Sequence, residues 1–275
     1  MSDPGRPPVS PDHNSSTVVH IVETWQPGPH GARDVHVYTS AHAVRLVLNG
    51  KVVATQGVPE RGWALFTSVA YADGVLEAHA LAADNTTVIA THSRSSWGVA
   101  AALVLSLDAP STSTGTGGAL YLDGSDVALV RASVVDARGN VVMGNDQNVT
   151  VAFKISSGPG LVVGCCNGNP ASHEANQAAA HSTYHGLVRA VVRVTLDAAS
   201  PDSMRAMRAT VDVDAGKDHR SSSVLPVGVT PPTRITVTAS APGLPDATIA
   251  IPLSIDPRDA PLAVAAASVR VASLQ

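Results

Sequence analysis

The residues whose side chains could best take part in catalysis or binding lie close together in one polar segment between two predicted strands. This segment contains Asn167, Asn169, His173 and Glu174. A carboxylate beside an imidazole can hold or move a proton, and amide side chains can bind hydroxyl groups. The same residue types also brace loops by bonding to nearby backbone groups. We therefore expect the segment to be mainly a structural loop, with contact to a sugar or to another domain as the alternative.

Metal chemistry has little support in the histidine spacing. Residues 173–177 read H-E-A-N-Q, so a glutamine stands where the zinc motif H-E-x-x-H requires its second histidine. A short helix over residues 175–184 would place His181 and His185 one turn apart, where both could bind zinc. No third ligand follows at a fixed spacing. We expect no metal site.

Other forms of catalysis also lack their motifs. Residues 158–164 are rich in glycine but do not read G-x-G-x-x-G, and no G-x-S-x-G nucleophile motif occurs. The two cysteines, Cys165 and Cys166, are adjacent, so on a strand they point to opposite faces and a bond between them would be strained. We expect no cofactor, no redox role, and one cysteine facing inward.

The few aromatic residues suggest a different kind of site. Only nine are present, and the three tryptophans, Trp25, Trp63 and Trp97, all lie in the first part of the chain. A buried tryptophan is a good anchor for a β-sandwich core, which is the default interpretation. Trp25 and Trp63 adjoin turn residues, so they are the candidates for exposure. An exposed tryptophan could bind a carbohydrate ring.

Composition narrows the class of protein further. The net charge is −4, and no basic run occurs, which argues against nucleic acid as a partner. No apolar stretch is long enough for a membrane helix, so we expect no membrane partner. Charged residues make up only 15% of the chain, and glycine and proline recur (22 and 19 residues), which favours short strands and turns. The repeated helices of a (β/α)₈ barrel are absent from the pattern.

The first half of the sequence predicts seven short strands joined by tight turns. Asn49-Gly50 is a strong hairpin signal between two of them. The strands are predicted near residues 18–22, 35–38, 43–48, 51–54, 64–71, 75–81 and 87–92. This spacing is typical of a β-sandwich.

A second set of strands follows. We predict them near residues 103–107, 127–135, 141–142, 149–155, 161–163, 187–196, 234–240 and 247–253. The sequence thus predicts an all-β protein with two tandem immunoglobulin-like sandwiches. Residues 1–17 read as a disordered leader, 18–98 as the first sandwich, 99–255 as the second with an insertion at 197–232, and 256–275 as a tail of unclear fold.

Several segments resemble sequence motifs of one enzyme family, and they occur in the same order as in that family. Residues 37–51 (V-Y-T-S-A-H-A-V-R-L-V-L-N-G-K) and 74–80 (G-V-L-E-A-H-A) resemble motifs that follow the catalytic barrel of glycoside hydrolase family 2, the β-galactosidase-like enzymes. Residues 122–140, 164–174 and 185–195 are similar to its bacterial Ig-like domain. The chain is thus similar to the family over residues 18–255, apart from the insertion. The cysteine pair and the insertion depart from the family pattern.

The resemblance implies carbohydrate metabolism and the hydrolysis of glycosidic bonds by the whole enzyme. The family's catalytic glutamates belong to the barrel, and no barrel is visible here, so no residue inherits a catalytic role. A retaining enzyme also needs two carboxyl groups about 5–5.5 Å apart. We expect this chain to be an accessory region whose partner is such a barrel, in cis or as a separate chain. The alternative is a stand-alone module that binds a glycan.

The compartment stays open. No signal peptide is visible, three glycosylation sequons occur, and the family resemblance is compatible with an extracellular or lysosome-like location.

Overall fold

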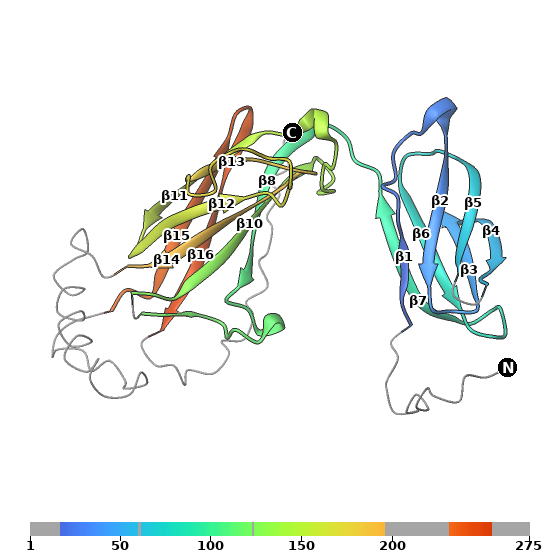
Figure 1. The fold of residues 1–275 in the computed structure, drawn as a ribbon, viewed down its shortest axis with the longest axis horizontal. Coiled ribbons are helices and arrows are strands. Elements are labelled where there is room, and N and C mark those ends of the chain that lie inside the picture. The colour runs from blue at the N-terminus through green and yellow to red at the C-terminus, as the bar shows by residue number, and fades with distance from the viewer. Residues whose placement is uncertain (1–16, 60–61, 123, 196–230, 255–275) are drawn as a thin grey trace. The chain divides into compact units, whose positions relative to one another are not determined.

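The protein is composed almost entirely of antiparallel β-strands, as the alternating sequence pattern predicts (Figure 1). The computed structural model describes residues 17–59, 62–122, 124–195 and 231–254. The predicted leader, nearly all of the predicted insertion and the predicted tail lie outside these residues. The chain divides into two compact units between Ser96 and Trp97. The described residues contain no helix that is long and apolar enough to span a membrane.

The first unit contains seven strands, each near a predicted position. They are β1 (Val19–Ile21), β2 (Ala32–Thr39), β3 (Ala43–Leu48), β4 (Lys51–Gly57), β5 (Trp63–Ala70), β6 (Val75–Leu81) and β7 (Val88–Ser95). They form a three-stranded sheet of order β1-β2-β5 and a four-stranded sheet of order β4-β3-β6-β7. Between the sheets lies a core that includes Ile21, Trp25, Leu46 and Phe66. Burial of these apolar side chains is the main force that holds the two sheets together.

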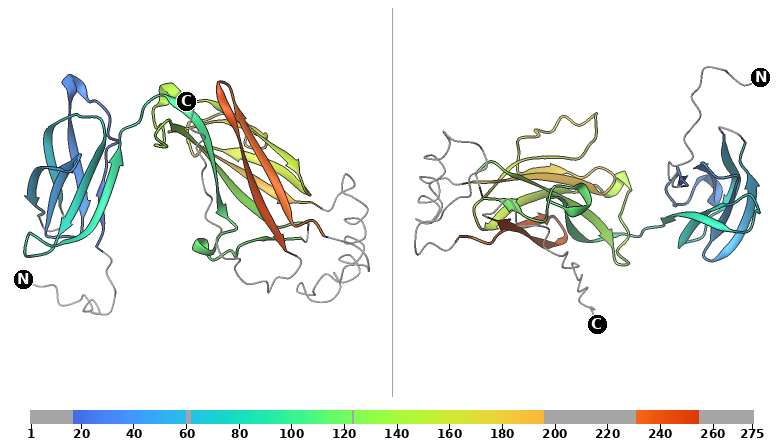
Figure 2. Two further views of the ribbon diagram at one scale, coloured as in Figure 1. Left: turned by 180° about the vertical axis from the view of Figure 1, so that it is seen from behind. Right: turned by 90° about the horizontal axis from the view of Figure 1, so that it is seen from below.

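The described residues of the second unit form nine strands. They are β8 (Ala100–Ala109), β9 (Leu120–Tyr121), β10 (Val127–Asp136), β11 (Thr150–Ser157), β12 (Gly160–Cys166), β13 (Ala180–Ser182), β14 (Leu187–Val194), β15 (Arg234–Ala241) and β16 (Leu244–Ser254). One sheet has the order β12-β14-β10-β8 and the other β13-β11-β15-β16-β9. The strands β15 and β16 run side by side in the second of these sheets (Figure 2). A long stretch of sequence separates them from the other strands of the unit.

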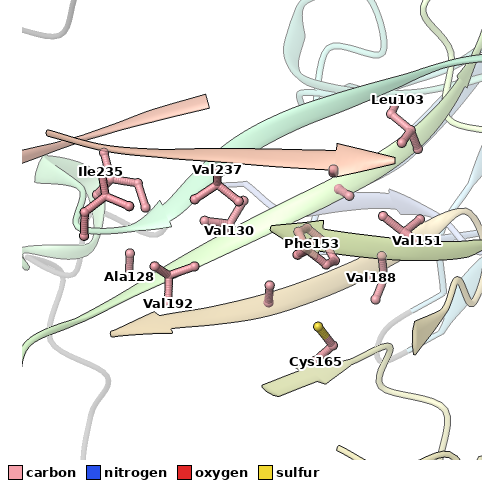
Figure 3. Close-up of a cluster of buried hydrophobic side chains, with 14 of the residues drawn as sticks. Leu103, Ala128, Val130, Val151, Phe153, Cys165, Val188, Val192, Ile235 and Val237 are labelled. Atoms are coloured by element: carbon pink, nitrogen blue, oxygen red, sulfur yellow. The ribbon is translucent and has the colours of Figure 1, made fainter. Parts of the chain in front are cut away.

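The second core lies between those two sheets. Strand β14 alternates between partly and fully buried residues along its whole length, so one face points inward. Val130 and Val188 from one sheet lie near Phe153 and Val237 from the other (Figure 3). The second unit is therefore also a sandwich, and the predicted fold class is confirmed.

Three features of this unit differ from the expectations above. Residues 175–184 are not a helix: Ala180–Ser182 form β13, which pairs with β11 because the ladder satisfies backbone groups that an isolated helical turn would leave open. Residues 141–142 contribute only an isolated bridge between Val135 and Val141. Trp97 belongs to the second unit, where it packs against that unit's core.

Candidate functional site

The predicted polar segment is the loop of residues 167–179 between β12 and β13. The Asn167 side chain donates to the Ser182 carbonyl (3.0 Å) and accepts from the Asn169 amide (2.9 Å). Asn169 in turn accepts from the Ala171 amide at 3.0 Å. Both asparagines therefore hold the backbone of the loop with their side chains. These contacts are the ones that the structural interpretation of the loop expects.

Glu174 binds the loop to β13. Its carboxylate accepts hydrogen bonds from the Ser182 amide (2.9 Å) and from the Ser182 hydroxyl. The His181 ring nitrogen Nδ1 lies 3.6 Å from the same carboxylate. Hydrogen bonds from Ser182 hold the pKa of Glu174 below its ordinary value. A general acid for glycoside cleavage needs a raised pKa. Glu174 is thus suited to bracing the loop as an anion at neutral pH.

The histidines near this loop do not converge. His173 is exposed and makes no hydrogen bond or ion pair with the described residues. His181 is buried and lies 3.1 Å from the Ser182 carbonyl, while His185 Nδ1 lies 3.1 Å from the Met143 carbonyl. Because β13 is a strand, His181 and His185 do not share a helical face. Within the described ranges, no three ligating side chains form a group that could hold a metal ion.

A shallow groove of about 270 Å³ adjoins the start of the loop. It is lined by Arg131, Cys166, Asn167, Gly168, Leu187, Val188 and Arg189. The Asp108 carboxylate contacts both arginines: Arg131 Nη2 lies 2.8 Å from it, and Arg189 Nε donates to it at 2.7 Å. Arg131 and Arg189 face each other directly in the ladder of β10 and β14. The carboxylate between them relieves a like-charge pair, so the cluster holds three strands together.

The adjacent cysteines point in opposite directions, as predicted. Cys165 is buried in the core, and Cys166 is exposed beside the groove. Burial raises the pKa of the Cys165 thiol to about 11, with the neighbouring Cys166 as a second cause. Cys165 therefore serves as a small apolar core residue, because its thiol stays protonated at neutral pH.

The two tryptophan candidates have different environments. Trp25 is 1% exposed, and its indole nitrogen donates to the Ala72 carbonyl at 2.9 Å. The expected exposure of Trp25 was therefore wrong: the ring closes the core of the first unit and contacts Tyr71. The expected exposure of Trp63 is confirmed, because half of its surface is open to solvent.

Trp63 has an aromatic partner that sequence reasoning missed. Tyr38 on β2 stands directly opposite Trp63 on β5 and is also 50% exposed. The ring centroids are 6.1 Å apart and the rings are nearly perpendicular, at 87°. Alternation along each strand places each ring on the outer face. Only the pairing of β2 with β5 brings the two rings together.

Parts of the chain are similar to known protein families. Residues 116–205 match the family model described as glycoside hydrolase family 2 C-terminal domain 5. Residues 31–89 match a domain of unknown function, DUF4982. A β-glucuronidase of Formosa agariphila is 35% identical over 122 residues, which are 44% of this chain and 12% of that protein.

Solved structures show the same fold. A glycosyl hydrolase family 2 member from Bacteroides cellulosilyticus matches 86% of this chain and 29% of its own, with 24% identity and a TM-score of 0.64. A β-glycosidase from Bacteroides vulgatus matches 86% of this chain and 25% of its own, with 16% identity and a TM-score of 0.62.

The fold is therefore a tandem pair of β-sandwich modules, and the solved structures named above contain the same fold. Residues 116–205 are thus similar to a C-terminal domain of glycoside hydrolase family 2, and the 122 residues that align with the β-glucuronidase point to the same family. The chain spans less than a third of the length of the relatives named above.

Proposed function

We propose that the chain is the non-catalytic accessory region of a glycoside hydrolase of family 2. The observation that carries this proposal is the match of residues 116–205 to a C-terminal domain of that family. In this role the two sandwiches pack beside a catalytic barrel, in the same polypeptide or in a separate one. They keep the barrel folded and soluble by covering part of its surface.

The chemistry of the described residues supports this role. Glu174 is engaged with Ser182, and Asp108 is engaged with two arginines. Both carboxylates are occupied by structural contacts, which suits a supporting module. A volume of about 270 Å³ is also at the small end for an enclosed ligand site.

A chimera tests the supporting role directly. In the β-glucuronidase of Formosa agariphila, the region that matches this chain is replaced by residues 1–275. We expect the chimera to be soluble and to hydrolyse 4-nitrophenyl β-D-glucuronide, whereas the same enzyme truncated before that region aggregates. Recovery of soluble protein and the rate of nitrophenol release are the two measurements. A chimera that aggregates like the truncated enzyme would contradict the proposal.

The isolated chain provides the complementary test. Purified residues 1–275 are incubated with 4-nitrophenyl β-D-galactoside and β-D-glucuronide, and we expect no release of nitrophenol above buffer. Glu174→Gln is the matched variant. Turnover that follows the chain through purification, with or without Glu174, would show that the region is itself catalytic.

A further inference from the structure

The first unit exposes an aromatic pair that its own fold does not require. Trp63 and Tyr38 are each 50% exposed on the outer face of the β1-β2-β5 sheet, away from the core of that unit. Tryptophan is usually well buried, and this chain has only three. Two large rings held side by side in solvent cost hydrophobic free energy unless something covers them.

Several polar atoms of this surface also lack a hydrogen-bond partner among the described residues. The Trp63 indole nitrogen and the Tyr38 hydroxyl form no hydrogen bond with any described residue. The buried Trp25, in contrast, donates to a carbonyl. His36 lies opposite Leu65 in the next row of the same face, and its Nδ1 contacts Glu23 at 2.6 Å. Its Nε2 has no partner in the described part of the chain. The rings therefore offer free polar atoms beside their apolar faces.

The ring geometry suits a saturated ring better than another aromatic surface. The two rings stand at 87°, so one presents its face where the other presents an edge. The face of an aromatic ring is negative and attracts C–H groups that carry partial positive charge. A pyranose with equatorial hydroxyls has such C–H groups on its faces, and its hydroxyls project from the rim toward donors and acceptors.

The surroundings favour a sugar over a protein partner. A stable protein interface buries about 800 Å² on each side, and charged residues are depleted from its centre. Here His20 lies opposite Tyr38, the exposed Asp34 lies on the same strand as Tyr38, and Glu23 contacts His36 of that strand. Polar groups thus begin one residue away from the rings. The two carboxylates also favour a neutral sugar over an acidic one.

From this arrangement we propose that Tyr38 and Trp63 form a binding site for a neutral pyranose unit of a glycan chain. The sugar ring stacks on one aromatic face, and its hydroxyls bind the free polar atoms of Tyr38, Trp63 and His36. This site is separate from the supporting role above, since a module can anchor an enzyme to a glycan without contributing to the stability of the barrel.

Affinity electrophoresis of the full chain tests the proposal. The native gels contain hydroxyethyl cellulose, β-1,4-galactan, β-mannan or β-xylan, with polygalacturonate as the acidic comparator. We expect at least one neutral polymer to retard the chain. Trp63→Ala should weaken the association constant by about tenfold or more, which corresponds to about 1.4 kcal/mol. Trp63→Phe, which keeps an aromatic face, should retain part of the affinity.

Val52→Ala is the matched control, because Val52 is 61% exposed on β4 in the other sheet. It should bind as the wild type does, and circular dichroism should show that all variants fold. The proposal is wrong if no neutral polymer retards the chain, or if retardation survives Trp63→Ala. It is also wrong if Trp63→Ala leaves glycan retardation unchanged but weakens association with a family 2 catalytic domain, which would make this surface a protein interface.

The chimera separates the two proposals. Trp63→Ala placed in the chimera should leave its solubility and its hydrolysis of the small nitrophenyl substrate unchanged. Failure of glycan binding with a soluble, active chimera would overturn only the glycan site. Glycan binding together with an aggregated chimera would overturn only the supporting role.

Discussion

Single carboxylates in this protein work as structural anchors. Asp136 accepts hydrogen bonds from the backbone amides of Gly98, Arg138 and Asn140. Burial opposes its ionisation, but these bonds prevail and keep the pKa of Asp136 below its ordinary value. Glu174 has the same role in the β12–β13 loop. Such anions stabilise the fold only while they remain ionised.

This behaviour predicts a pH-dependent effect of Glu174→Gln. The folded-state pKa of Glu174 is lowered, so its contribution to stability is full above the ordinary value of 4.5 and is lost as pH falls through the folded-state value. Glutamine keeps the shape but provides only a neutral acceptor. We expect a lower melting temperature than wild type at pH 7, with the difference shrinking below about pH 4. Thermal melts from pH 3 to 7 measure it.

Glu77→Gln is the control for loss of a negative charge. The Glu77 carboxylate lies 3.8 Å from His79 and bears no comparable set of hydrogen bonds. A difference between wild type and Glu174→Gln that stays constant over the whole pH range would refute the assignment of Glu174 as an ionised brace.

At the scale of the element, the hairpin between β3 and β4 is the best determined feature. Asn49 and Gly50 both have positive φ (50° and 77°), which matches the twist of the two strands. The Asn49 side chain also reaches a second turn, where it donates to the Asp73 carbonyl and accepts from the Val75 amide. One asparagine thus joins two turns of the same sheet.

The close packing of Gly74 against Asn49 predicts that alanine costs more stability at Gly74 than at Gly50. A Cβ on Gly74, which has φ 134°, would lie 1.9 Å from Asn49 Oδ1, so Gly74→Ala must displace the amide and both of its hydrogen bonds. We expect Gly74→Ala to lower the free energy of unfolding by about 2–4 kcal/mol. Gly50→Ala has open space and only backbone strain, so it should cost about 1–2 kcal/mol. Urea denaturation provides the values.

Gly57→Ala is the neutral comparison. Gly57 does not have a positive φ, and no atom lies within 4 Å of the position that an alanine Cβ would occupy. Equal losses for Gly57→Ala and Gly74→Ala would show that Asn49 does not join the two turns.

In the molecule as a whole, the buried apolar residues form two separate cores. Leu46 is fully buried in the first core and Phe153 in the second, and no residue is shared between the two clusters. Each sandwich therefore has its own hydrophobic driving force. This arrangement predicts two unfolding events in calorimetry.

Core truncations assign those events. Leu46→Ala should destabilise one transition by about 2–5 kcal/mol and leave the other in place. Phe153→Ala should do the reverse, by about 3–5 kcal/mol. Scanning calorimetry of wild type and both variants measures the transitions, with Val52→Ala as the exposed control. A single transition that both truncations lower equally would contradict separate cores.

Local sequence patterns predict most of the strands and much of the loop chemistry. Alternation with period two is a local property, so seven strands of the first unit were predictable, including β3 and β6 with their observed ends. Side chains that bond to backbone groups a few residues away, such as Asn167 and Asn169, also act locally. The family motifs lie in these same local segments.

Which residues meet across strands depends on the tertiary structure. Trp25 and Trp63 both adjoin turns, yet one closes a core and the other lies in solvent. The pairing of Tyr38 with Trp63, and the placing of Asp108 between Arg131 and Arg189, depend on which strands become neighbours. That choice depends on burial and backbone hydrogen bonding over the whole unit, and residues far apart in sequence contribute to it. The same long-range pairing made residues 180–182 a strand, although the local sequence also allowed a short helix there.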